Sequence, residues 1–414
     1  MPVGCHIVLD LSRLMSRAER AVPTGIDRVE LAYAEHFIAA ARERLSFAGM
    51  LSWGRFGLLD APTAIALVAA LGTVWRSDPP DREAEQAAAR AIRALRRARL
   101  LRGGLGLAAA LRRAGGRPVY LHVSHHHLDR PEIVERLRQR AGARFACLVH
   151  DVIPVEFPEY VRPGHAVRHA ARMATVARCA DLVIVNSAAT RDAFRPFLER
   201  AGRTPPVLVA PLGVEVPAHP VVAPDGRAPY FVCVGTIEPR KNHLLLLNVW
   251  RRLAAEQGRD APRLVLVGQR GWENEQVIDM IERSPAIQGL VEEHNGLSDA
   301  AMARLIAGAR ALLLPSFAEG YGLPVGEALA FGCPVLCSPL PALRQVAGDV
   351  AEFLDPLDGA AWQAAILDYA RPDSPRRAAQ LARLDHWHAP TWAEHFAIVD
   401  RALRALAAAE PVHV

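Results

Sequence analysis

Short apolar segments of β type alternate with longer helical segments over most of this 414-residue chain, and the alternation occurs in two blocks. Segments that are apolar on both faces and separated by helices predict parallel sheets with helices on both sides. The first block contains CHIVLDLS, VYLHVS, RFACLVHD, DLVIVNS and PVLVAPLG, and the second contains YFVCVGT, RLVLVGQ, ARALLLPS, PVLCS and AEFLDP. The expected fold class is therefore α/β, with two doubly wound, Rossmann-like domains.

A proline-rich segment without periodicity, VEVPAHPVVAPDGRAP, separates the two blocks. It predicts a linker at 214–229 between an N-terminal domain at 1–213 and a C-terminal domain at 230–390. The last segment, 391–414, has a helical pattern, and we expect it to pack back toward the N-terminal domain. In doubly wound sheets, ligands bind at the carboxyl ends of the strands. We therefore expect a cleft with the ligand site between the two domains.

Composition indicates an ordinary globular protein, with 51% hydrophobic and 22% charged residues. The six cysteines form no C-x-x-C pair, and most lie in apolar strand-like segments, which predicts buried, reduced thiols. The longest apolar run, Ala61 to Trp75, is too short to span a bilayer and predicts a core or interfacial helix. The start of the chain lacks the pattern of a secretory leader, so the expected location is the cytoplasm.

The net charge of +5 conceals an asymmetry. Residues 1–215 contain 31 arginines against 21 acidic residues, and the remainder contains 18 basic against 23 acidic residues. The basic half predicts either an anionic partner, such as the inner face of the cytoplasmic membrane, or a solvated arginine-rich surface; we expect no nucleic acid. A helix expected at 82–102 has a thin apolar stripe and is predicted to be exposed. Its arginines are Arg90, Arg93, Arg96, Arg97 and Arg99.

Lys241, in GTIEPRKNH, is the single lysine of the chain, and it follows Arg240 directly. One explanation is chance in a chain that uses arginine almost everywhere. The other is function, because lysine presents a compact point charge and arginine a planar fork. A compact ammonium suits a phosphate oxygen in a tight pocket. The segment has a strand, a turn and then a helix, so both cations are predicted at the carboxyl end of a strand.

A second strand-to-helix loop lies in ALLLPSFAEGYGLPVGEALAFGCPVLCS, residues 311–338. Gly320 and Gly322 allow backbone N–H groups to approach a ligand, and the helix that follows offers an anion site at its N-terminus. Glu319 lies in the loop and Glu327 lies in the helix. Two carboxylates beside an anion site indicate hydroxyl groups on the ligand, as sugars and riboses provide.

On these motifs the chain resembles the retaining, nucleotide-sugar-dependent glycosyltransferases of family 4, of the bacterial surface-polysaccharide type, which have the GT-B fold. The glutamate pair with its glycines is the most specific motif, and G-T-x-E-P-R-K-N is the next. HDVIPVEFPEY at 150–160 and PTGIDRVE at 23–30 resemble N-terminal loops of the same family. Many members have an arginine directly after Gly235, where this chain has Thr236.

The resemblance implies roles for matching positions. Arg240 and Lys241 hold the donor diphosphate, Glu319 contacts the donor sugar, and Glu327 binds the ribose. His150 faces the donor sugar from the N-terminal domain. The implied catalytic residues are Arg240, Lys241, Glu319 and His150. The implied donor-binding residues are Gly25, Gly235, Arg240, Lys241, Glu319, Gly320, Tyr321, Gly322, Leu323 and Glu327.

On the acceptor side, the sequence offers Asp27, Arg28, His125 and His127 as candidates. Asp27 and Arg28 are equally compatible with a charge pair at a helix start. Histidines crowd the end of one expected strand at His122 and 125–127, and histidine is a common metal ligand. Neighbouring residues on a strand point to opposite faces, however, and the chain has no D-x-D motif. We therefore expect no metal and no cofactor.

The resemblance implies metal-independent transfer of a sugar from a nucleoside-diphosphate sugar to a saccharide or lipid-linked saccharide acceptor. The leaving phosphate itself accepts the acceptor's proton on the same face of the sugar, so no protein nucleophile is required. Two alternatives stay open: a membrane-associated scaffold that binds a sugar nucleotide without turnover, and a nucleotide-sugar epimerase of the same fold. The sequence does not identify the donor sugar, the base or the acceptor.

Overall fold

A computed structural model describes residues 5–20, 22–50, 56–78, 81–98, 117–215 and 229–408. The chain forms two compact units. Unit 1 comprises residues up to 155, residues 166–212 and the segment from 392 onward. Unit 2 comprises residues 156–165 and 213–391, so a short excursion of the first half of the sequence belongs to unit 2. The expected linker lies almost entirely outside the described residues.

The sheet of unit 1 has the strand order β3-β2-β1-β4-β5-β6-β7. Its strands are parallel except for the antiparallel pair β2–β3. The order of the parallel strands reverses direction between β1 and β4, as in a doubly wound fold. The strands are β1 (Ile7–Asp10), β2 (Leu45–Met50), β3 (Phe56–Leu58), β4 (Val119–His122), β5 (Arg144–Val149), β6 (Leu182–Val185) and β7 (Val207–Val209).

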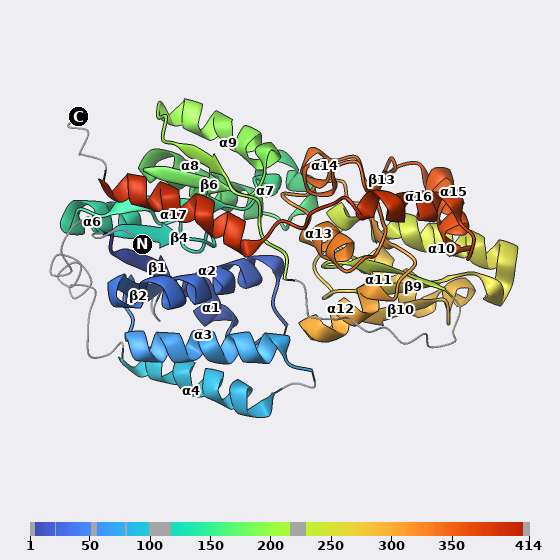
Figure 1. Cartoon of the computed structure of the whole chain (residues 1–414), viewed down its shortest axis with the longest axis horizontal. Helices are drawn as coiled ribbons and strands as arrows, with labels where there is room; N and C mark the ends of the chain where they lie inside the picture. The colour runs from blue at the N-terminus through green and yellow to red at the C-terminus, as the bar shows by residue number, and fades with distance from the viewer. Residues whose placement is uncertain are drawn as a thin grey trace. The chain divides into compact units, whose positions relative to one another are not determined.

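Helices surround this sheet, and the last helix of the chain, α17 (Trp392–Ala408), lies along β4, β5 and β6 (Figure 1). His395 of α17 is buried, and its Nε2 lies 2.8 Å from the hydroxyl of Tyr33. The C-terminal helix therefore completes the core of unit 1. The other helices of this unit are α1 (Ser12–Arg17), α2 (Gly25–Ala41), α3 (Ala61–Arg76), α4 (Arg82–Ala98), α6 (Pro131–Ala141), α7 (Ile153–Glu156), α8 (His165–Cys179) and α9 (Ala188–Ala201).

Unit 2 has a second, fully parallel sheet with the order β10-β9-β8-β11-β12-β13. Its strands are β8 (Tyr230–Val234), β9 (Arg263–Val267), β10 (Val291–His294), β11 (Leu312–Leu314), β12 (Val335–Cys337) and β13 (Glu352–Phe353). Its helices are α10 (His243–Gln257), α11 (Glu275–Arg283), α12 (Asp299–Ala307), α13 (Leu323–Ala330), α14 (Pro341–Ala347), α15 (Gly359–Ala370) and α16 (Pro375–Leu384). The prediction of two doubly wound α/β domains is confirmed.

Three strands were missing from the expected set: β2, β3 and β10. β10 reads VEEH, and two glutamates within four residues hide its strand character. β2 begins at Leu45, only a few residues after α2 ends at Ala41. All six cysteines are buried and free, as the sequence predicted.

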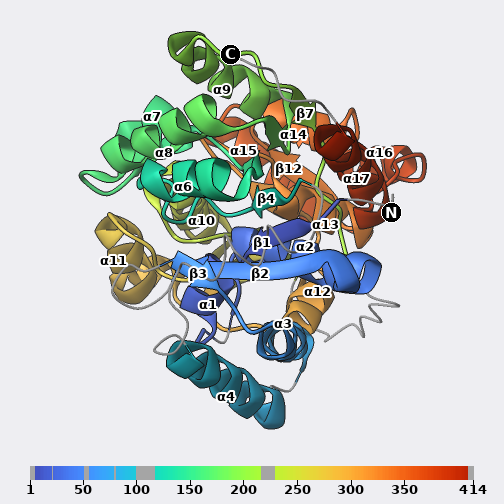
Figure 2. The same cartoon turned by 90° about the vertical axis from the view of Figure 1, so that its left-hand side faces the viewer.

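The arginine-rich helix α4 packs along α3, and the two lie side by side in both views (Figures 1 and 2). Its apolar stripe is wider than expected, because buried alanines extend it. The buried residues are Ala84, Ala88, Ala91, Ile92 and Leu95. Arg90, Arg93, Arg96 and Arg97 are exposed on the other face, and Arg99 lies outside the described residues. The prediction of an exposed helix is therefore correct only for the arginine face.

The apolar run of Ala61 to Trp75 forms α3, a helix with Leu67, Leu71 and Trp75 in the core. It contacts α2, α4 and β2, which makes it a core helix. Among the described residues, no helix combines the length and apolar character needed to cross a bilayer.

Replacing Leu95 with alanine should destabilise unit 1, because Leu95 fills the interface of α4 with its neighbours. Truncation of a buried leucine costs about 2–5 kcal/mol. Urea unfolding followed by circular dichroism should show an earlier transition. Arg93→Ala, on the exposed face of the same helix, is the matched control and should stay within about 0.5 kcal/mol of the parent. Equal midpoints for the two variants would show that α4 is not docked.

Candidate functional site

In unit 2 the strand order reverses between β8 and β11, which are hydrogen-bonded neighbours. In open α/β sheets, ligands bind outside the carboxyl ends of the strands at such a switch point. The loop after β8 contains GTIEPRKN and the loop after β11 contains FAEGYG. Both motifs singled out in the sequence therefore meet at the switch point of one sheet.

Lys241, Arg240 and Glu319 form one cluster at this point, called here the cation–carboxylate cluster. Lys241 Nζ donates to Glu319 Oε1 at 2.5 Å, and Arg240 Nη1 donates to Glu319 Oε2 at 3.0 Å. Arg240 Nη1 also donates to the carbonyl oxygen of Ala318 at 2.9 Å. The carboxylate thus connects the two cations directly.

Neighbouring charges keep Glu319 ionised even though the side chain is buried, with only 7% of it exposed. Burial raises the pKa of Glu319, but the charges of Lys241 and Arg240 and a hydrogen bond from Ser316 outweigh it and lower the pKa to about 2. The cluster therefore carries two positive charges and one strong negative charge at neutral pH.

Two glycines with positive φ shape the loops. Gly235 has φ +151°, and a Cβ there would lie 3.3 Å from Lys241 Cε, so glycine leaves room for the lysine stem. Gly322 has φ +101° and precedes α13; a Cβ there would lie 2.4 Å from Leu343 Cδ2. Leu323 begins α13, and proline follows in its first turn, as expected. The positive end of the helix dipole at a helix start favours an anion.

The other predicted residues of this unit lie on the same loop and helix. Gly320 and Tyr321 are in the loop between β11 and α13, and Tyr321 is buried. Glu327 is half-buried on α13. The residues of unit 2 that the sequence singled out thus lie in the loops after β8 and β11 and in α13.

Two further side chains, which the sequence did not predict, contact the cluster. Glu238 is buried, and its Oε1 pairs with Arg240 Nε at 2.5 Å. Burial raises the pKa of Glu238, and the charges of Arg240 and Lys241 counteract this rise. Ser316 Oγ donates to Glu319 Oε1 at 2.7 Å. Glu238 lies two residues before Arg240, and Ser316 lies three residues before Glu319. This closeness in sequence could have predicted the contacts, because such neighbours can reach the same turn.

An aromatic contact lies next to the cluster. Tyr160, in the excursion at 156–165, stacks on Phe317 with 5.8 Å between ring centroids. The backbone N–H of Phe317 donates to the carbonyl of Arg240, which links this stack to the loop after β8. Trp272 Nε1 donates to the carbonyl of Tyr160 at 2.9 Å. Trp272 therefore anchors the excursion.

In unit 1, His150 follows β5 and is buried. Its Nε2 lies 2.5 Å from the carbonyl oxygen of Val123, so it donates there. His125 Nε2 accepts from the backbone N–H of His150 at 3.2 Å. Burial lowers the pKa of His150 and of His125, which favours neutral rings. His125 therefore supports His150, whereas the sequence suggested direct acceptor contact.

Asp27 is fully buried, and both of its oxygens are used inside unit 1. Oδ1 accepts from Arg13 Nε at 2.5 Å, and Oδ2 accepts from the backbone N–H of Thr24 at 2.8 Å. The second contact caps α2. Of the two explanations for Asp27, the structure favours the helix start. Gly25 is exposed at the first residue of α2, and Arg28 is half-buried.

Two protein-family models match this chain. Residues 228–371 match the model described as Glycosyl transferases group 1, and residues 124–209 match the Glucosyltransferase 3-like, N-terminal domain. The first match contains the whole cation–carboxylate cluster. The chain therefore carries a glycosyl transferases group 1 domain.

Similar curated proteins include two from Escherichia coli. O-antigen chain mannosyltransferase B is 39% identical over 150 residues, which is 36% of this chain and 39% of that protein. Serotype-specific mannosyltransferase WbdA is 30% identical over 242 residues, 54% of this chain and 29% of WbdA. The alignments thus span less than two-fifths of these relatives' own length.

Solved structures with the same fold cover almost the whole chain. Trehalose-6-phosphate synthase OtsA has a TM-score of 0.62 at 12% identity and covers 98% of this chain and 100% of its own. Anabaena HepE in complex with UDP has a TM-score of 0.61 at 12% identity, over 97% and 100%. The chain therefore has the GT-B fold, as the resemblance implied.

The low pKa of Glu319 predicts how Glu319→Gln changes stability with pH. A depressed carboxyl pKa contributes stability above the unfolded pKa, and this contribution is lost as pH falls toward the folded pKa. The free energy of unfolding of the parent should exceed that of Glu319→Gln by on the order of 3 kcal/mol at pH 7, and by about half as much at pH 3. Urea unfolding at the two pH values measures both differences.

The control for this measurement is Glu282→Gln. Glu282 pairs with Arg270 on the surface, where 51% of the Glu282 side chain is exposed. Glu282→Gln should change the free energy of unfolding by less than about 1 kcal/mol at both pH values, because water screens exposed ion pairs. A pH-independent difference for Glu319→Gln would contradict the ionised, paired carboxylate.

Proposed function

We propose that this protein is a glycosyltransferase that moves a sugar from a nucleoside-diphosphate sugar to a saccharide or lipid-linked saccharide acceptor in bacterial surface-polysaccharide synthesis. The observation that carries the proposal is the cation–carboxylate cluster at the switch point of unit 2. The cluster combines two adjacent cations with the carboxylate of Glu319, and α13, which carries Glu327, begins in the same loop; all lie in a region that matches a glycosyltransferase model.

Each part of the cluster suits one part of such a donor. Arg240 and Lys241 neutralise the diphosphate, and the helix dipole at the start of α13 adds positive potential. Glu319 accepts hydrogen bonds from hydroxyls of the donor sugar, and Glu327 accepts them from the ribose. The diphosphate competes with Glu319 for the two cations, so donor binding reorganises the contacts within the cluster.

The chemistry we propose is retaining and independent of a metal or other cofactor. The bond from the sugar's anomeric carbon to the diphosphate oxygen breaks, and an oxygen of the acceptor hydroxyl bonds to that carbon on the same face. The hydroxyl proton passes to the leaving phosphate. Preorganised charges that meet a leaving group's growing charge lower the barrier most. Arg240 and Lys241 supply these charges, which supports transfer without a divalent cation.

A mannosyl group is the first donor sugar to test, because both relatives described above are named mannosyltransferases. The direct experiment incubates the protein with GDP-, UDP- and dTDP-sugars, with and without saccharide acceptors, and follows release of the nucleoside diphosphate. Product with the α configuration of the donor supports retaining transfer. Binding of a sugar nucleotide without turnover under any condition would indicate the scaffold alternative, and an epimerised donor would indicate the epimerase.

Lys241→Ala should lower kcat by about 100- to 1,000-fold, as when one preorganised donor to a developing oxyanion is removed. Lys241→Arg should also be impaired, though less. Glu327→Ala is the comparison: a ribose contact acts in ground and transition states alike, so it should raise KM and leave kcat nearly unchanged. Steady-state kinetics on folded variants separates the two effects. An unchanged kcat in Lys241→Ala would remove the lysine from the diphosphate site.

We propose that the exposed arginine face of α4 binds the anionic inner surface of the cytoplasmic membrane. The apolar face of α4 is already used against its neighbours, so the attraction is electrostatic, at about 1 kcal/mol per basic residue. The protein should sediment with anionic vesicles, less so as salt increases, and not with neutral vesicles. Replacing Arg90, Arg93 and Arg97 with glutamine should abolish sedimentation.

Arg251→Gln with Arg252→Gln removes two exposed charges from α10; it is the control for this experiment and should sediment like the parent. Equal sedimentation with both kinds of vesicle would contradict the proposal.

A further inference from the structure

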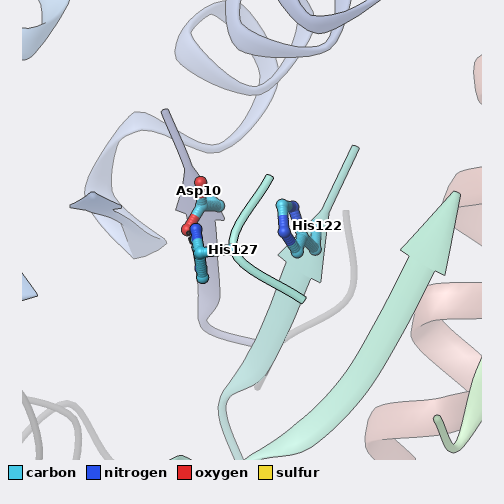
Figure 3. Close-up of side chains that lie close together, drawn as sticks. All are labelled: Asp10, His122 and His127. Carbon is cyan, nitrogen blue, oxygen red and sulfur yellow. Dashed lines mark ion pairs between the residues drawn. The ribbon is translucent and has the colours of Figure 1, made fainter. Parts of the chain in front are cut away.

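Unit 1 has its own switch point, between the neighbouring strands β1 and β4, and a group of buried polar side chains lies there. Asp10 ends β1, His122 ends β4, and His127 lies in the turn after β4. Figure 3 shows His127 pointing toward Asp10, with His122 on the adjoining strand. We call these three residues the His–Asp cluster. Among the catalytic, donor-binding and acceptor-side candidates that the sequence offered, only His127 belongs to the His–Asp cluster.

The three residues are arranged like ligands of a metal ion. One ligand atom of each lies within 4.8 Å of the others. His127 Nε2 is 3.5 Å from Asp10 Oδ2, and the Tyr120 hydroxyl donates to the same oxygen at 2.8 Å. Ligand atoms around a tetrahedral zinc ion are about 3.3 Å apart, so small side-chain movements suffice to close the site.

The hydrogen bonds around the cluster prepare it for a cation. His122 Nε2 lies 2.7 Å from the carbonyl oxygen of His126 and donates to it, which leaves a lone pair on His122 Nδ1. That Nδ1 is buried and has no hydrogen-bond partner among the described residues. Asp10 Oδ1 accepts from the backbone N–H of Ser12 at 2.9 Å. A second ring nitrogen bonded to a carbonyl is the usual support of a metal-binding histidine.

The backbone of the turn explains why the histidines converge although the sequence predicted that they would not. His125 and His127 have φ values of +57° and +51°. Such a conformation is strained for a residue with a side chain, and strain of this kind gathers at functional sites. Because these residues form a turn and not a strand, His127 folds back to the face of the sheet edge on which Asp10 and His122 lie.

Buried polar atoms without partners concentrate here. Besides His122 Nδ1, the Nδ1 atom of His127 is buried and has no hydrogen-bond partner in the described part of the chain. Buried polar groups normally have partners, so such a concentration requires a species to satisfy it. The fully buried Asp10 carboxylate has the His127 ring, the Tyr120 hydroxyl and the Ser12 N–H as partners.

We propose that Asp10, His122 and His127 bind a zinc ion, or a divalent transition metal of similar preference, which joins the ends of β1 and β4 inside unit 1. Two imidazoles and one carboxylate are a zinc-type donor set, and the hydroxyl of Tyr120 stands beside it. The ion compensates the buried carboxylate and holds the strained turn. Because it joins two strands of unit 1, we expect a structural role for it.

The test measures metal on the full-length protein. Metal-stripped protein is incubated with zinc, dialysed against metal-free buffer and analysed by mass spectrometry; about one zinc per chain should remain. Zinc should also raise the Tm of the stripped protein, and cobalt should give the visible absorption bands of a tetrahedral site. His122→Asn and His127→Asn should weaken zinc binding by about 100-fold or more.

His243→Asn is the matched control. His243 is a buried histidine of unit 2 whose two ring nitrogens have no partner among the described residues. Unlike His122 and His127, it does not belong to the group of candidate metal ligands found in the described part of the chain. This variant should keep the full zinc content. Stripped parent protein that takes up neither zinc nor cobalt at micromolar concentration would overturn the proposal, whether or not the variants fold. Full zinc content in folded His122→Asn and His127→Asn would overturn it as well.

Chelation distinguishes this site from the proposed transfer chemistry. Loss of activity after stripping that zinc or cobalt restores, and magnesium does not, supports a structural ion in unit 1. Restoration by magnesium or manganese alone would overturn metal-independent transfer, and the zinc-uptake measurement would still decide the His–Asp cluster on its own.

Discussion

The constraint on which both units depend is the reversal of strand order in a parallel sheet. Where the order reverses, the two crossover connections leave in opposite directions, and the carboxyl ends of two neighbouring strands stay uncovered. In unit 2 these strands are β8 and β11, and in unit 1 they are β1 and β4. Residues 78 positions apart, Lys241 and Glu319, can therefore share a hydrogen bond. Each unit gathers its polar chemistry at this one point.

Glu319 makes the cation site stable before any ligand arrives. Two cations side by side repel each other, and burial makes an uncompensated charge costly. The carboxylate between Arg240 and Lys241 removes both problems, and Glu238 holds Arg240 from the other side. A diphosphate can take over the same cations only by displacing or sharing this carboxylate.

The sequence was sufficient for the fold class and for most of the switch-point loops of unit 2, because strand periodicity and glycine placement are local properties. It was insufficient where a side chain's partner lies far away in sequence. Asp27 was compatible with two roles until its contact with Arg13 was known. Glu238 gave no pattern of its own. The histidines after β4 were assigned to a strand, and the positive φ of His125 and His127 leaves no sequence signal in a residue that is not glycine.

The contacts of the single lysine of the chain differ from those of the neighbouring Arg240. Its stem passes Gly235 so closely that a Cβ at this glycine would lie 3.3 Å from Lys241 Cε, and its ammonium ends on one oxygen of Glu319. A guanidinium is wider and needs a planar set of acceptors. Arg240 has such a set, with Glu238 at Nε and with Glu319 and a carbonyl at Nη1. The fork and the point charge therefore have different partners here, Arg240 with three acceptors and Lys241 with one carboxylate oxygen.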